Sequence, residues 1–185
     1  MLFYTFPYLL FFLPITLVLF FYGKFLKIDR KIILILLSAF FYSWWNIYYL
    51  PLIIFSILMN YYFYKKITSG KSNRKKNLVF GITLNILLLI IFKYTDFIIQ
   101  NINLLLSTNF GYLNLPFPLA ISFFTFQSIT FLVNVYDEDI LDVKAKDFFL
   151  FIIFFPQLIA GPIVRYHHMM PQFNNEANWI FNKKN

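Results

Sequence analysis

The chain has 185 residues, of which 60% are hydrophobic and 23% aromatic, while only 13% are charged. This composition excludes an ordinary soluble domain, and the lack of cysteine excludes disulfides, thiolate catalysis and cysteine metal sites from this sequence. The net charge of +8 does not indicate nucleic-acid binding, because ten of the 16 basic residues lie between Lys24 and Lys76, in two short loops. In a membrane protein such clusters indicate orientation and contact with anionic lipid headgroups.

Uncharged runs predict an all-α fold, a polytopic transmembrane helix bundle. At ~1.5 Å per residue a helix needs about 20 residues to cross a ~30 Å hydrocarbon core, and several runs reach that length. The runs comprise residues 1–23, 32–64, 77–92, 97–136 and 148–164. The first run lacks a basic leader and a small-residue cleavage site, so we expect a retained span rather than a removed signal peptide.

Two basic loops set the expected orientation. Residues 23–31 and 65–77 are rich in lysine and arginine, so the positive-inside rule places both loops in the cytoplasm and the amino terminus outside. An even number of crossings must separate the loops, so the run 32–64 is expected to turn at residues 44–51, where aromatic residues precede Pro51. Loop 65–77 also admits a regulatory or lipid-binding role, although a topology signal is the simpler interpretation.

After an expected outward span over residues 78–93, the pattern changes. Polar residues recur at i, i+4, i+7 and i+11 on one face of a helix, while isoleucine and leucine fill the other face. The polar positions are Asp96, Gln100, Asn103 and Ser107. This pattern predicts an amphipathic helix that lies in the membrane surface rather than a further span.

Residues 116–136 are expected to return inward, to the acidic segment DEDILDVKAKD. Gln127, Thr130 and Asn134 share one face of this helix, because they stand at i, i+3 and i+7. Two interpretations of this face stay open. The side chains form interhelical hydrogen bonds that hold the bundle together, or they line a tunnel.

The densest chemistry lies in residues 154–173, with the sequence FFPQLIAGPIVRYHHMMPQF. Pro156, and Gly161 followed by Pro162, break a continuous helix. Irregular backbone at membrane depth must be covered by protein or line a water-filled cavity. We therefore expect about five spans, a surface helix and one proline-broken segment in a single membrane-embedded region, 1–185, with 173–185 as an unstructured tail or the start of a further segment.

Standard catalytic patterns are missing from the sequence, which has no phosphate-binding glycine loop, no paired carboxylates at membrane depth and no nucleophile elbow. Only His167 and His168 can act as bases near neutral pH or bind a metal. Adjacent histidines point in different directions on a helix, and no second ligand follows at i+3 or i+4, so we expect no metal site. A catalytic base and an interfacial polar patch remain as alternatives, and the patch is favoured.

Four segments carry a recognisable pattern: FFYSWWN at 40–46, FKY at 92–94, LPFPLAISFFTFQ at 115–127 and FPQLIAGPIVRY at 155–166. In order and spacing they resemble the amino-terminal half of the bacterial membrane-bound O-acyltransferase (MBOAT) family, and the alginate O-acetylase type in particular. The resemblance implies a multispan enzyme of the bacterial inner membrane that moves an acyl group, usually acetyl, to an extracytoplasmic polysaccharide.

The same resemblance implies a cytoplasmic acyl donor, acetyl-CoA or another acyl thioester, with no tightly bound cofactor. Membrane lipid, the polysaccharide acceptor and an extracytoplasmic acetyltransferase are the implied partners, without nucleic acid. The motif residues are expected to shape a pore wall and its rim. They are Ser122, Gln127, Pro156, Gln157, Gly161, Pro162 and Arg165, to which the polar face of the preceding span adds Asn134.

The family's essential membrane histidine lies in a later segment, so the resemblance assigns no catalytic residue to this chain. His167 and His168 do not match that position. We therefore expect a truncated chain that is inactive by itself and poorly stable in detergent. Two alternatives stay open: a channel or transporter, for which broken helices and polar residues at depth are also typical, and an inactive structural fragment.

Overall fold

The computed structural model describes residues 3–23, 28–70, 73–140, 142–161, 164–175 and 178. Every regular element within these ranges is a helix, which confirms the all-α prediction. The elements are η1 (Tyr8–Phe12), α1 (Leu13–Tyr22), α2 (Arg30–Trp45), η2 (Ile47–Tyr49), α3 (Leu50–Thr68), α4 (Arg74–Leu89), η3 (Ile90–Tyr94), α5 (Thr95–Leu106), α6 (Ile121–Tyr136), α7 (Ala145–Ile153), α8 (Phe155–Ala160) and α9 (Tyr166–Asn174).

Within the described ranges, two helical stretches are long and apolar enough to cross a membrane: Ile47–Thr68, with 22 residues, and Arg74–Leu106, with 33 residues. Two shorter apolar helices, Tyr8–Tyr22 and Ile121–Tyr136, fall at the first and last predicted spans. α2 has 16 residues and is therefore about 24 Å long, less than a hydrocarbon core. Each predicted span thus contains a helix, but the predicted number of about five crossings is not confirmed.

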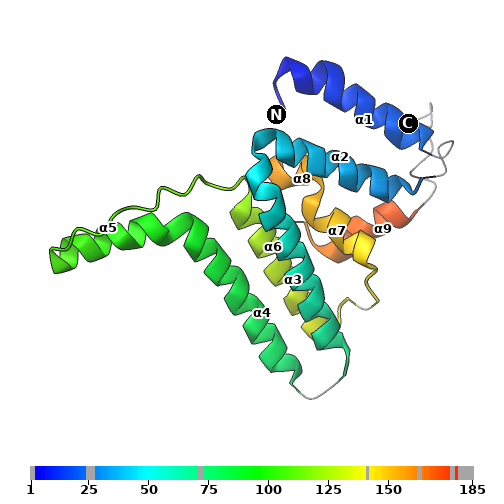
Figure 1. Ribbon diagram of the computed structural model, residues 1–185. Coiled ribbons are helices and arrows are strands. Elements are labelled where there is room, and N and C mark those ends of the chain that lie inside the picture. The colour runs from blue at the N-terminus through cyan, green and yellow to red at the C-terminus, as the bar shows by residue number, and fades with distance from the viewer. Residues whose placement is uncertain are drawn as a thin grey trace.

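The predicted corner at residues 44–51 lies where α2 ends and α3 begins. Asn46 accepts a hydrogen bond from the backbone N–H of Tyr48 at 3.0 Å, which closes a short turn. Pro51 lies in the first turn of α3, where a missing N–H breaks no helical hydrogen bond. From this corner the two helices diverge, so α2 packs mainly against α7, while α3 packs against α4 and α6 (Figure 1).

α3, α4 and α6 lie side by side at the centre of the protein (Figure 1). Gly81 of α4 permits close contact, because a Cβ at this position would lie 2.9 Å from Leu132 Cδ1. Asn60 of α3 and Asn85 of α4 are almost fully buried, and each donates to the other's amide oxygen, at 3.1 and 2.7 Å. Such reciprocal bonds satisfy both amides where water is excluded, so they fix the register of α3 on α4.

α4 continues through the wider turn η3 into α5, which points away from the bundle (Figure 1). We call α5 together with residues 107–117 the arm. Asp96 accepts from the backbone N–H groups of Leu113 and Asn114 at 2.8 and 3.1 Å, and Asn103 Oδ1 accepts from that of Phe110 at 2.9 Å. Part of the predicted polar face therefore holds the segment that follows the helix.

The acidic segment 137–147 bridges the two basic loops. Three ion pairs join this segment to the two basic loops: Asp147 pairs with Lys31 at 2.6 Å, Lys146 with Asp29, and Glu138 with Arg74. We call this part of the protein the charged end. These ion pairs bring the acidic segment together with both basic loops.

Segment 173–185 is expected to be an unstructured tail or the start of a further segment. α9 continues past Pro171 and includes the first two residues of this segment, Phe173 and Asn174. Beyond residue 175 the structure describes only Asn178, so the rest of the predicted tail lies outside the described residues.

Candidate functional site

The helix break in the proline-broken segment begins at Phe154, two residues before Pro156. α7 ends before Phe154, which is non-helical with a ψ of 107°, and α8 follows with Pro156 in its first turn. Pro156 has no N–H to donate to the carbonyl of Ile152, and its ring would clash with that carbonyl in a continuous helix. The predicted helix break is therefore confirmed, and α8 in turn ends before Gly161.

Backbone groups freed by this break find partners on neighbouring helices. In a continuous helix the Phe155 N–H would donate to the Phe151 carbonyl, but here it donates to Ser38 Oγ of α2 at 3.2 Å. The Phe151 carbonyl instead accepts from Gln127 Nε2 of α6 at 2.9 Å. All four residues are buried, where an unpaired polar group costs about 1–3 kcal/mol. Gln127 thus follows the first of its two interpretations, an interhelical hydrogen bond.

Phe155 also anchors the broken segment by aromatic packing. The centroid of its ring lies 5.1 Å from that of Phe12, 5.2 Å from that of Phe41 and 6.4 Å from that of Tyr8. These four side chains form a small core of their own, separate from the main core of the bundle. The first helix and α2 therefore hold the start of α8 in place.

Other motif residues meet at the end of the bundle away from the charged end. Three hydrogen bonds join α2, η2 and η3 to the segment that leads into α6 and to the first turn of α6: Tyr42 donates to the Leu119 carbonyl at 3.1 Å, Tyr49 to the Pro116 carbonyl and Lys93 to Ser122 Oγ at 3.4 Å. Lys93 Nζ also lies 5.9 Å from the centroid of the Phe117 ring. The four segments that carry the family resemblance therefore lie together in space, connected through α2 and α6.

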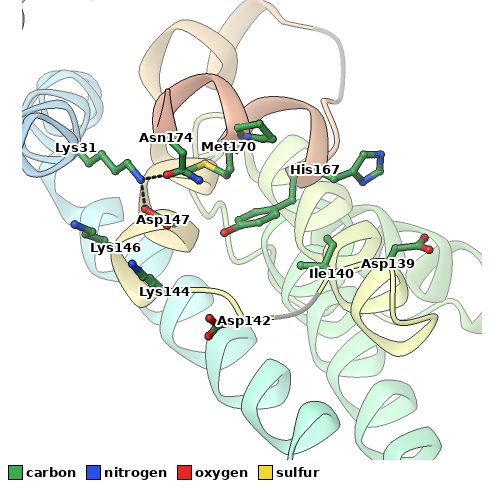
Figure 2. Close-up of a pocket in the computed structure, with 12 residues that line it drawn as sticks. Lys31, Asp139, Ile140, Asp142, Lys144, Lys146, Asp147, His167, Met170 and Asn174 are labelled. Carbon is green, nitrogen blue, oxygen red and sulfur yellow. Dashed lines mark hydrogen bonds and ion pairs between the residues drawn. The ribbon is translucent and has the colours of Figure 1, made fainter. Parts of the chain in front are cut away.

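A polar pocket of about 400 Å³ lies at the charged end, between segment 137–147 and α9 (Figure 2). Lys31 donates to Asp147 at 2.6 Å and to Asn174, and the side chains of the ion pair are only 7% and 8% exposed. His167 lines the same pocket, and its Nδ1 is buried with no hydrogen-bond partner among the described residues. The pocket therefore combines a tightly held charge pair with one polar atom that lacks a protein partner.

Tyr166 forms the apolar side of this pocket. The centroid of its ring lies 5.4 Å from that of Phe131 and 5.3 Å from that of Phe151. Burial raises the pKa of the Tyr166 hydroxyl above its ordinary value, and the negative charge of Asp147 raises it further. The hydroxyl is therefore protonated at neutral pH and can donate a hydrogen bond.

The two histidines lie together at the start of α9, with ring centroids 4.2 Å apart. His168 is exposed, whereas His167 is half-buried beside the pocket. In the part of the chain that the structure describes, no three histidine, aspartate or glutamate side chains are placed to hold a metal ion.

The remaining predicted site residues do not form one cluster. Asn134 is buried on α6, and its Nδ2 has no partner in the described ranges. Gln157 packs against Gly161, where a Cβ would lie 3.2 Å from Gln157 Cα. Arg165 is exposed directly before α9, and Pro162 lies outside the described residues.

Sequence reasoning missed Ser38 and the buried pair of Lys31 with Asp147. A signal for the pair was present, because each charged residue directly precedes an apolar run that forms a helix. Ser38 gave no such signal. A lone serine within an apolar helix acquires its role only from the break that faces it, 117 positions further along the chain.

Together, the fold and the site define a helical protein of membrane type, in which side chains of neighbouring helices enclose a proline-broken segment. The chain is 39% identical over 147 residues to a peptidoglycan O-acetyltransferase of Helicobacter pylori, a match that covers 65% of this chain and 28% of that protein. It is 33% identical over 109 residues to proteins named probable alginate O-acetylase AlgI in Pseudomonas aeruginosa and Pseudomonas putida, covering 56% of this chain and 21% and 22% of those proteins.

These homologues confirm the resemblance to the MBOAT family and its alginate O-acetylase type. The chain spans about a quarter of the length of the curated relatives that it matches. No family model matches the chain, and no solved structure matches it.

Proposed function

We propose that this chain forms part of a membrane O-acyltransferase that moves acetyl groups from a cytoplasmic donor to a polysaccharide of the cell envelope or an exported polysaccharide. Two findings together support the proposal. The relatives are named O-acetyltransferases of peptidoglycan and of alginate, and the motif segments that resemble this family meet around α2, α6 and the broken segment.

In this proposal, α2, α6 and the broken segment form part of the wall around the reactants. Ser38 and Gln127 hold the two free backbone groups, so the chain can leave the helical path at Phe154 and still keep a fixed position. Fixed positions matter for group transfer, because a donor and an acceptor held in reacting geometry avoid much of the entropic cost of meeting. The contribution of these residues is therefore positioning rather than chemistry.

Polar side chains at depth favour this proposal over the channel or transporter. Gln127 binds a backbone carbonyl, and Asn60 and Asn85 bind each other. Such contacts between helices stabilise a packed bundle. A channel would direct such groups toward a permeating solute instead. Solute flux through the protein in liposomes, with no change in polysaccharide acetylation in cells, would reverse this preference.

The proposed orientation places the charged end in the cytoplasm of the bacterial inner membrane, where an acyl thioester such as acetyl-CoA would arrive. The amino terminus and the arm would then lie outside, near the polysaccharide acceptor and an extracytoplasmic acetyltransferase partner. Because the chain has no cysteine, single cysteines can report the side cleanly. Ser69→Cys should react with an impermeant maleimide only from the cytoplasm and Asn109→Cys only from outside, and the reverse pattern would contradict the orientation.

The proposal assigns the catalytic base to the family's later membrane histidine and leaves His167 and His168 outside the chemistry. By this reasoning the 185 residues should not transfer acetyl groups alone. In cells, replacing both histidines by glutamine should leave polysaccharide acetylation within about twofold of the wild type at equal protein level. A loss of about a hundredfold or more, typical of a missing general base, would return the catalytic role to this pair.

The main test is genetic. Deleting the gene should lower the ester-linked acetate of a cell-envelope or exported polysaccharide, measured as acetate released by mild base, and the wild-type gene should restore it. An unchanged acetate content in every such polysaccharide would contradict the proposed function.

A further inference from the structure

Among the described residues, no helix packs against the outer face of α4. Gly81, Asn85 and Leu89 lie on the opposite face, buried toward α3 and α6. The outward positions follow the helical period and are all exposed: Lys75, Lys76, Val79, Phe80, Thr83, Ile86 and Leu87. A shallow pocket of about 540 Å³ opens on the first half of this face, lined by Asn73, Lys75, Lys76, Val79, Phe80 and Thr83.

Lys75 and Lys76 provide uncommitted positive charge at the start of this face. Neither forms an ion pair with any carboxylate in the described residues. Neighbouring cations are engaged elsewhere: Lys65 lies over the rings of Tyr61 and Tyr64, Lys66 over that of Tyr62, and Arg74 pairs with Glu138. Two adjacent free ammonium groups attract an anion, most of all one with the compact charge of a phosphate.

The surface one turn further along α4 is apolar. Val79 and Phe80 are 53% and 58% exposed, and Ile86 and Leu87 continue the same face. The hydroxyl of Thr83 donates to the Val79 carbonyl at 2.8 Å, so it offers no free donor to a ligand. Positive charge followed by apolar surface along one helix complements a molecule with an anionic head and a hydrocarbon tail.

The depth of this face of α4 in the membrane indicates which kind of molecule with an anionic head and a hydrocarbon tail it binds. α4 begins the 33-residue helical stretch that is long and apolar enough to cross a membrane, so its first turn would lie at headgroup level. Val79 and Phe80 follow four residues later, about 6 Å deeper along the helix. We propose that this pocket binds an anionic phospholipid, with its phosphate between Lys75 and Lys76 and one acyl chain along Val79 and Phe80.

This inference does not depend on the acyltransferase proposal, because it uses only the charge, exposure and depth of α4. The test is native mass spectrometry of the whole protein released from membranes that contain phosphatidylglycerol and phosphatidylcholine with identical acyl chains. We expect about tenfold preferential retention of phosphatidylglycerol, since each lysine near an anionic headgroup strengthens its binding severalfold. Equal retention of the two lipids would overturn the site.

Matched variants separate a local site from net charge. Lys75→Gln with Lys76→Gln should abolish the preference, whereas Lys75→Arg with Lys76→Arg should keep it. Lys65→Gln with Lys66→Gln removes the same charge from the same end but leaves the pocket intact, so it should keep the preference. Equal loss in the two glutamine pairs would show attraction by net charge alone and would overturn the site.

Two further arms identify the ligand. Phe80→Ala should lower retention of phosphatidylglycerol several-fold, because the acyl chain loses its main exposed contact, and Phe80 is exposed enough for the fold to tolerate the change. Millimolar inorganic phosphate should not displace the lipid. Full displacement by phosphate together with an unaffected Phe80→Ala variant would show a site for free phosphate rather than for a lipid.

Discussion

Four side chains of the bundle, Ser38, Asn60, Asn85 and Gln127, are at most 5% exposed and bind groups on other helices. In the arm, the half-buried Asn103 binds the segment directly after its own helix. Ser38 binds the backbone of Phe155, 117 positions away, and Asn60 binds Asn85 across 25 positions. Asn103 in the arm binds Phe110, only seven positions away.

Burial decides which of these polar contacts hold the protein together. A polar group that loses its partner in the bundle stays buried, and its desolvation is no longer compensated. A polar group that loses its partner in the arm can bind water instead. Substitutions in the bundle should therefore change global stability, whereas substitutions in the arm should change local order only.

The largest expected effect is at the buried ion pair of the charged end. Lys31→Met leaves the Asp147 carboxylate buried without its cation and should lower the free energy of unfolding by about 3–5 kcal/mol. The double variant Lys31→Met with Asp147→Leu should recover most of this loss, because neither charge is then buried. Titration with a denaturing detergent measures the stability of both variants. An unchanged stability of Lys31→Met would show that the ion pair does not stabilise the bundle.

Next is the hydrogen bond that covers the helix break. Ser38→Ala leaves the Phe155 N–H buried and unpaired, which should cost about 1–3 kcal/mol. Ser43→Ala on the same helix is the matched control, because the Ser43 hydroxyl donates only to the Ala39 carbonyl of its own helix. The control should lose less than about 0.5 kcal/mol. Equal effects of the two variants would contradict the assigned role of Ser38.

The reciprocal amide pair should have a smaller effect. Asn85→Leu leaves Asn60 without its partner on α4 and should cost about 0.6–1.7 kcal/mol, between the average and the largest value measured for polar contacts between membrane helices. The further change Asn60→Leu should add little, since the interaction is already lost. Additive losses in a double-mutant cycle would show that the two amides act independently.

A smaller, pH-dependent effect on stability is expected at the ion pair between Asp29 and Lys146 of the charged end. Burial alone would raise the pKa of Asp29, but the hydrogen bonds from the Lys146 side chain and the Lys31 backbone N–H, together with the charges of both lysines, outweigh it, so the pKa lies below its ordinary value of 3.8. The hydrogen bond to Asp29 raises the pKa of Lys146 above its ordinary value of 10.5.

The pair of Asp29 and Lys146 therefore contributes its full stabilisation between pH 3.8 and pH 10.5, the two ordinary pKa values. This stabilisation is lost as the pH falls through the lowered pKa of Asp29, or rises through the raised pKa of Lys146. The stability difference between wild type and Asp29→Asn, measured across pH, should be flat in this window and shrink on both sides. It should also be small, because the Lys146 side chain is 42% exposed. A difference that grows below pH 3 would reverse the sign and contradict the pairing.

The smallest effect on global stability is expected in the arm. Asp96→Ala removes the acceptor for the backbone N–H groups of Leu113 and Asn114, so hydrogen exchange at these two amides should accelerate. Unfolding of the bundle should stay within about 0.5 kcal/mol of the wild type. Asn101→Ala is the control, because Asn101 binds only the Phe97 carbonyl of its own helix. A global loss of stability would show that the arm is part of the bundle.

Short-range features could be read from the sequence alone. Helical periodicity located the helices, the aromatic residues before Pro51 located the corner, and the polar positions from Asp96 to Ser107 located the amphipathic helix. Pro156 located the helix break to within two residues, because a missing N–H acts on the carbonyl four positions earlier. The motifs also sufficed to identify the family that the homologues then confirmed.

Local sequence patterns therefore predict which segments are helices, where the chain turns or breaks and which family it resembles, since these depend on residues a few positions apart. Which polar groups meet is set by the packing of the helices in three dimensions. It paired Lys31 with Asp147 across 116 positions, and it placed Ser38 and Gln127 against the freed backbone of the break. The physical reason is that a buried polar group must find a partner wherever packing places one, and no local pattern along the chain specifies that partner.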